Sequence, residues 1–230
     1  MPPEYNMNIK EIVEFNGFQF EEHKVTTKDG YILTVHRMKA PTTKKGAPVV
    51  FFQHGMSNNS YDWVVHTKDK APALRLAAEG YDVWLGNNRG NQFSRGHKTL
   101  NPEKEADKKE YFNYDFEELG KYDLPAQIDL VRDITGKDKV TYVGHSQGTT
   151  QMFYALATNE AELKNKINLF VALSPVVRLG FDNSMKGAWL ADQARYAIED
   201  LVDATGGYEF GGFDSKVENK SEWDFDWDAW

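Results

Sequence analysis

The chain has 230 residues, no cysteine and a formal net charge of −8 at pH 7, with 40% hydrophobic and 27% charged residues. This balance is typical of a globular protein of one domain, or of one domain with an insertion. The negative charge argues against nucleic acid as the main partner, and the lack of cysteine excludes disulfides and thiolate metal sites. No transmembrane segment and no signal peptide are predicted, so the residues by themselves assign no compartment.

The N-terminal part of the chain predicts a β-hairpin followed by a buried strand. Residues 18–25 and 31–38 are rich in strand-forming residues and are separated by the turn signal Lys28-Asp29-Gly30. Residues 49–52 form an unbroken apolar run, which is typical of a strand buried on both faces of a parallel sheet.

Helices and strands are then expected to alternate. The patterns predict helices over 71–79, 123–135 and 147–158, strands over 81–86, 139–143 and 167–173, and surface loop and helix over 101–118. This order predicts βαβ units, and therefore an α/β fold with a mostly parallel sheet covered by helices on both faces.

The pattern changes after Pro175, which divides the chain into a core of residues 1–177 and a divergent segment of residues 178–230. The segment holds no strand–helix pair that resumes the sheet, so the sheet is expected to stop after its sixth strand. An apolar edge of this kind predicts a cover, either a protein partner or the 178–230 segment itself. Aromatic and acidic residues alternate over 223–230, which favours docking on a partner because exposed tryptophans are costly in water.

The most informative motif is Gly144-His145-Ser146-Gln147-Gly148, which fits the Gly-x-Ser-x-Gly pattern of a nucleophile elbow. The strand before it and the helix after it favour an elbow over a simple glycine-rich turn. Gly144 and Gly148 leave room where side chains would collide, and Ser146 projects from the sheet as the nucleophile. The backbone N–H of Gln147, at the helix N-terminus, would bind the developing oxyanion.

A second oxyanion donor is expected from the loop after an earlier strand. Residues 49–53 are that strand, and His54-Gly55-Met56 is the loop. Gly55 permits a close backbone approach, and the N–H of Met56 would be the donor. The alternative is that His54 and Gly55 only end the strand.

Residues 87–91, Asn87-Asn88-Arg89-Gly90-Asn91, form a loop at the carboxyl end of a strand. Ligands bind at such positions in α/β proteins. The alternative, which we favour, is a structural loop in which Arg89 makes an internal salt bridge.

Several segments of the first 177 residues share a family pattern. They are Glu21-Glu22-His23-Lys24-Val25-Thr26-Thr27-Lys28-Asp29-Gly30-Tyr31-Ile32-Leu33, Phe52-Gln53-His54-Gly55, residues 80–91, Lys121-Tyr122-Asp123-Leu124-Pro125-Ala126, residues 142–150 and Leu173-Ser174-Pro175-Val176. Together they resemble the acid lipase family, which contains gastric and lysosomal lipases and steryl ester hydrolases. The resemblance implies an α/β-hydrolase fold, acylglycerol or steryl ester substrates, no cofactor and no metal, and a secretory or lysosomal location. It places the nucleophile on Ser146 and the oxyanion donors on Met56 and Gln147.

One departure from the family pattern matters for activity. The family carries its catalytic aspartate and histidine after the serine, whereas no histidine follows His145 in this sequence. His145 is expected to point away from the Ser146 hydroxyl, and His66 or His97 could approach it only on flexible loops. Two hypotheses remain: a lipase-type ester hydrolase whose acid and base come from another chain, and a non-catalytic, lipase-derived subunit of a larger complex.

Overall fold

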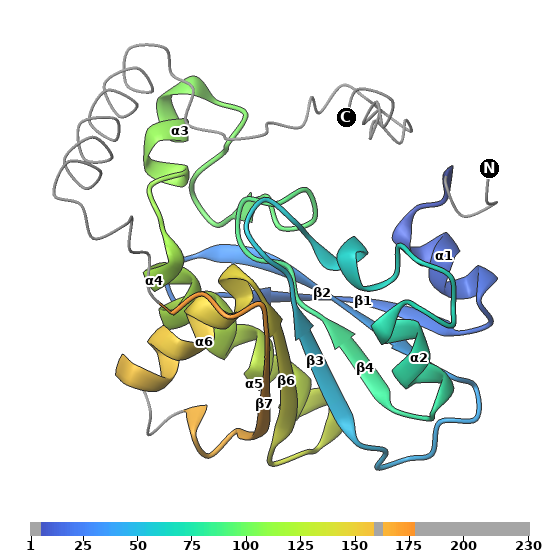
Figure 1. Ribbon diagram of the computed structural model, residues 1–230. Coiled ribbons are helices and arrows are strands. Elements are labelled where there is room, and N and C mark those ends of the chain that lie inside the picture. The colour runs from blue at the N-terminus through green and yellow to red at the C-terminus, as the bar shows by residue number, and fades with distance from the viewer. Residues whose placement is uncertain (1–5, 159–162, 178–230) are drawn as a thin grey trace, which may run out of the picture.

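The computed structural model describes residues 6–158 and 163–177, which fold around one mixed sheet (Figure 1). The strand order across the sheet is β1 (Gln19–Thr26), β2 (Tyr31–Lys39), β4 (Asp82–Leu85), β3 (Val49–Gln53), β6 (Val140–His145) and β7 (Ile167–Leu173). All six expected strands are therefore confirmed. The two-residue strand β5 (Gly96–His97), which pairs with β2, is too short to give a sequence pattern and was not expected.

The sheet is antiparallel at one end and parallel at the other. β1 and β2 form the expected hairpin, and β2 continues antiparallel to β4. From β4 through β3 and β6 to β7 every pairing is parallel. The carboxyl ends of β3, β4 and β6 therefore lie along one edge, where the loops with the candidate site residues begin.

One face of the sheet is covered by α1 (Ile9–Phe15) and α2 (Pro72–Ala78). Ile12, Leu74 and Phe52 pack in this hydrophobic cluster. The helix α2 was expected, whereas α1 was not. Its signal is a capping box, in which the Asn8 side chain accepts from the Glu11 N–H and the Glu11 carboxylate accepts from the Asn8 N–H.

The other face is covered by α5 (Leu124–Thr135) and α6 (Gln147–Thr158), which Figure 1 shows on the side of the sheet opposite α1 and α2. Phe51 packs with Ile128 and Met152 here, whereas its neighbour Phe52 belongs to the first cluster. All five residues of β3 are buried, as the apolar run predicts for a central strand. The expected α/β arrangement, a mostly parallel sheet with helices on both faces, is therefore confirmed.

The polar stretch around residues 101–118 forms loop and short helix, as expected. It contains α3 (Glu105–Tyr111) and α4 (Phe116–Glu118), and a π-helical turn, η3 (Leu119–Asp123), joins α4 to α5. The helical path thus begins before residue 123, because Asp115 and Glu118 form a capping box at the start of α4. A 3-10 helix, η2 (Ser60–Trp63), follows β3.

In the described part of the chain, β7 is the last strand of the sheet. Leu169 and Leu173 on this strand are 55% and 40% exposed. The 178–230 segment lies outside the described residues, so a cover on this edge stays a prediction. No helix within the described ranges is long and apolar enough to cross a membrane.

Candidate active site

Ser146 occupies the single-residue turn between β6 and α6. Its φ is +51°, a left-handed conformation that costs a non-glycine residue free energy. The Ser146 N–H donates to the Leu173 carbonyl at 3.0 Å, so the turn is tied to the end of β7. This strand–turn–helix geometry is that of a nucleophile elbow.

The two glycines of the motif sit where the turn leaves no room for a side chain. A Cβ on Gly144 would lie 2.7 Å from the Gly148 carbonyl oxygen. A Cβ on Gly148 would lie 2.6 Å from the Gln53 carbonyl oxygen and 2.8 Å from that of His54. The start of α6 therefore packs directly on the end of β3, which brings the elbow against the 54–56 loop.

The 54–56 loop faces Ser146 through Gly55. A Cβ on Gly55 would lie 3.2 Å from the Ser146 Cβ and 3.4 Å from His145 Nδ1. Within the described residues, the Met56 N–H donates to no backbone carbonyl, and Met56 is 65% exposed. The Gln147 N–H is in the first turn of α6, where amides have no intrahelical acceptor. The structure thus brings together the residues that the sequence singled out.

His54 is buried behind this loop. Its Nδ1 lies 2.7 Å from the Gly55 carbonyl oxygen, and its Nε2 lies 3.1 Å from the Asn88 backbone nitrogen. Burial lowers the pKa of His54 to about 4, so the ring is neutral near pH 7. His54 is unsuited to act as the general base of Ser146, because its lowered pKa makes the ring a weak base and both ring nitrogens are bonded to other groups.

A buried polar network beneath the first turn of α6 holds the elbow in place, and the sequence patterns did not predict it. The Tyr142 hydroxyl donates to the Gly148 carbonyl at 2.6 Å, and the Gln151 amide lies between Tyr142 and Asn88. Thr149 accepts at its hydroxyl from the Val176 N–H at 3.0 Å. These side chains hold the first turn of α6 to β6 and to the segment after β7. The signal that could have predicted this network is the presence of polar residues at otherwise apolar positions of β6 and α6.

No histidine side chain hydrogen-bonds to Ser146 within residues 6–158 and 163–177. His97 accepts from the Thr99 and Leu100 N–H groups through Nδ1, and His66 is exposed. The His145 ring lies edge-on to Trp63. The described residues also hold no group of three or more acidic or histidine side chains that could bind a metal ion.

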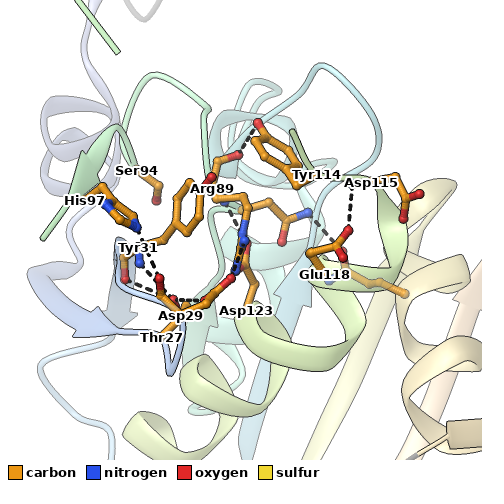
Figure 2. Close-up of polar contacts among 12 residues, drawn as sticks. Thr27, Asp29, Tyr31, Arg89, Ser94, His97, Tyr114, Asp115, Glu118 and Asp123 are labelled. Carbon is orange, nitrogen blue, oxygen red and sulfur yellow. Dashed lines mark hydrogen bonds and ion pairs between the residues drawn. The ribbon is translucent and has the colours of Figure 1, made fainter. Parts of the chain in front are cut away.

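The 87–91 loop is held by an internal ion cluster around Arg89, shown in Figure 2. The guanidinium bonds to both oxygens of Asp29 and to Asp123 at 2.7–3.0 Å, and it stacks on the Tyr31 ring. Burial raises the pKa of Asp123 to about 6, although Arg89 beside it favours the ionised form. The expected internal salt bridge of Arg89 is therefore confirmed, and this side chain has a structural role in the loop.

Comparison with known proteins identifies the family. Residues 48–207 match the family model described as "alpha/beta hydrolase fold", and residues 9–67 match the model described as "partial alpha/beta-hydrolase lipase region". The chain belongs to the α/β-hydrolase family.

Several relatives of this α/β-hydrolase are lipases. It is 44% identical to human lipase member K over 186 residues, which cover 79% of this chain and 45% of that protein. The human lysosomal acid lipase/cholesteryl ester hydrolase gives the same values, and the mouse gastric triacylglycerol lipase is 43% identical over 79% of this chain and 46% of its own length. The resemblance to acid lipases is confirmed, and the chain spans less than half the length of these relatives.

A solved structure agrees on the fold. The structure of DcsB with its substrate analogue superposes with a TM-score of 0.53 at 15% identity, covering 80% of this chain and 54% of that one. At this identity the match concerns the fold alone.

Proposed function

We propose that this α/β-hydrolase takes part in lipase-type hydrolysis of carboxylic esters, with acylglycerols or steryl esters as substrates and Ser146 as the nucleophile. The observation that carries the proposal is the left-handed Ser146, with φ +51°, in the turn between β6 and α6. Strain of this kind persists only where the surroundings enforce it, and it is typical of functional positions.

The proposed oxyanion donors are the backbone N–H groups of Met56 and Gln147. Two donors are needed because the tetrahedral intermediate of ester hydrolysis carries its negative charge on one oxygen. The close approach of Gly55 to the Ser146 Cβ supports this assignment, because Met56 is the next residue of the same loop. The lipase relatives support the reaction class.

The proposed general base and its acid come from outside these 230 residues, on another polypeptide segment. All six histidines lie at or before residue 145, and the contacts of His36, His54 and His97 hold them in other parts of the structure. Without a base, a serine hydroxyl in an elbow loses orders of magnitude in rate.

The test is labelling with a fluorophosphonate probe together with turnover of a p-nitrophenyl ester. The chain is assayed alone and in its native assembly, which is the chain together with the polypeptide segment that supplies the base and the acid. Ser146→Ala is the control. We expect weak or no labelling of the chain alone and Ser146-dependent labelling and turnover in the assembly. Inactivity in the native assembly, with Ser146→Ala without effect there, would contradict the proposal and favour a non-catalytic subunit.

A further inference from the structure

The loop from His54 to Ser60 carries the Met56 amide between the end of β3 and the start of η2. Its middle is exposed, and Ser57 has a left-handed φ of +59°. An exposed turn of this kind does not by itself hold one peptide group at a fixed angle. Its two ends, however, are buried and bonded to the 87–91 loop.

At the first end, the hydrogen bonds determine the tautomer of His54. Nε2 faces two donors, the Asn88 N–H at 3.1 Å and the Asn91 side-chain NH₂ at 3.3 Å. Nε2 must therefore accept, so the single proton of the neutral ring is on Nδ1. Nδ1 then donates to the Gly55 carbonyl oxygen at 2.7 Å.

This bond sets the direction of the Met56 amide. The carbonyl of Gly55 and the N–H of Met56 belong to one planar peptide unit and point in opposite directions. Fixing the carbonyl toward the buried His54 ring thus turns the Met56 N–H away from the interior. The direction of the Met56 N–H is therefore fixed although the N–H itself donates to no backbone carbonyl of the described residues, so it is available to a ligand.

The orientation of Asn91 is determined as well. Its Oδ1 accepts from the Phe93 and Ser94 N–H groups at 3.0 and 3.1 Å. Its NH₂ group is therefore directed to Asn87 Oδ1, at 3.1 Å, and to His54 Nε2. A flipped amide would lose both backbone bonds, so Asn91 presents a donor to His54.

Asn87 connects the two ends of the loop. Its Oδ1 accepts from Asn91 and also from the Ser60 N–H at 2.9 Å, and the Ser60 hydroxyl lies 2.8 Å from His36 Nδ1. One buried network thus holds His54 at the start of the loop and Ser60 at its end. The side-chain amides of Asn87 and Asn91 are fully hydrogen-bonded within it, and such bonding confers rigidity.

From this geometry we propose that His54 and Asn91 are positioning residues, which aim the Met56 N–H at the oxyanion of the substrate. Asn91 supports the His54 tautomer together with the Asn88 N–H, and His54 holds the Gly55–Met56 peptide unit. The proposal deepens the proposed function and rests on Met56 as an oxyanion donor.

The first experiment needs no activity. Nitrogen-15 NMR of the His54 ring at pH 7 reports its tautomer, and backbone nitrogen-15 order parameters report the mobility of residues 55–59. We expect a proton on Nδ1 and a bare Nε2. His54→Leu removes the donor to Gly55, so the order parameters of residues 55–59 should fall from about 0.85 to below about 0.6, the range of flexible backbone. His54→Asn, whose amide nitrogen can take the place of Nδ1, should restore the wild-type order parameters.

Asn91→Ala tests the second residue. We expect the proton to stay on Nδ1, because the Asn88 N–H still donates to Nε2, and the order parameters of residues 55–59 to fall because the loop loses its bond to Asn91. Thr135→Val is the matched control, because the Thr135 hydroxyl bonds to the Val131 carbonyl within α5. It should lower stability slightly and leave the order parameters of 55–59 at the wild-type level.

The second experiment follows the fluorophosphonate labelling of Ser146 in the native assembly. Loss of an oxyanion donor costs about 10²- to 10³-fold in rate, so His54→Leu should slow labelling by about tenfold or more, with a smaller effect on probe affinity and with recovery in His54→Asn. A proton on Nε2, or unchanged order parameters of residues 55–59 in His54→Leu, would overturn the positioning proposal. Absence of labelling in the wild-type assembly would instead contradict the proposed function, and the NMR result would still stand.

Discussion

Gly55 and Ser146 meet across the ends of β3 and β6, so that a Cβ on Gly55 would lie 3.2 Å from the Ser146 Cβ. The two residues are 91 positions apart in the sequence. Their contact depends on the parallel pairing of β3 with β6, which aligns Gln53 with Gly144. The sheet register thus brings a loop and a turn together into one site.

The first prediction concerns Gly55→Ala. The added methyl group is too close to the Ser146 Cβ and has to push the loop away by a few tenths of an ångström. We expect labelling of Ser146 in the native assembly to slow by about tenfold, because oxyanion donors act over short distances. The thermal unfolding midpoint should change little. Labelling at the wild-type rate would show that the loop does not contribute to the site.

The second prediction concerns Gly148→Ala, which tests packing and not chemistry. The new methyl group would lie 2.6 and 2.8 Å from two backbone carbonyl oxygens of β3 and its loop. Backbone cannot move as easily as a side-chain end, so the free energy of unfolding should fall by about 1–3 kcal/mol. Urea unfolding measures the change.

The third prediction compares Ser146→Gly with Ser146→Ala. Glycine tolerates the left-handed φ of +51°, whereas alanine keeps the Cβ and its strain. Ser146→Gly should therefore raise the free energy of unfolding by about 1 kcal/mol over Ser146→Ala. Both variants should lose all labelling of this residue. Equal unfolding midpoints for the two variants would mean that the turn stores no strain.

The fourth prediction concerns the buried ion cluster of the 87–91 loop. Arg89 bridges Asp29 and Asp123 with its fork of donors, and a lysine cannot bond to both carboxylates in this way. Arg89→Lys leaves buried charge without its partner, so it should cost about 3–5 kcal/mol of unfolding free energy.

Urea unfolding measures this loss as well. Glu103→Gln is the control, because it removes a more exposed ion pair with Arg95 and should stay close to wild type. A stability of Arg89→Lys equal to that of the control would rule out a structural role for the cluster.

The fifth prediction concerns pH and Glu21. Burial alone would raise the pKa of Glu21, but hydrogen bonds from Lys39 and Arg37 lower it from 4.5 to about 2. A carboxylate whose pKa is lower in the folded state stabilises the fold above pH 4.5, and this contribution is lost as the pH falls toward 2.

Glu21→Gln should therefore have a lower unfolding midpoint than the wild type at pH 6, and the gap should close progressively below pH 4.5. Thermal unfolding at a series of pH values tests this. Glu14→Gln, at an exposed position of α1, is the control for replacing an exposed carboxylate by an amide. A gap that is independent of pH would mean that the hydrogen bonds of Glu21 do not depend on its charge.

The sequence by itself determined the local parts of this protein. The hairpin, the central strands and the elbow follow from short-range patterns, because alternation, glycine positions and apolar runs act within a few residues of one another. The motif around Ser146 even predicted its turn, since the geometry of the motif depends on its own two glycines.

The tertiary structure decided which distant groups meet. It set Gly55 against Ser146, gave Arg89 the partners Asp29 and Asp123, and fixed the tautomer of His54 through Asn88 and Asn91. These contacts join residues 34 to 91 positions apart, where no local periodicity constrains the partner. Side-chain direction and sheet register select them, and both arise only when the strands are paired.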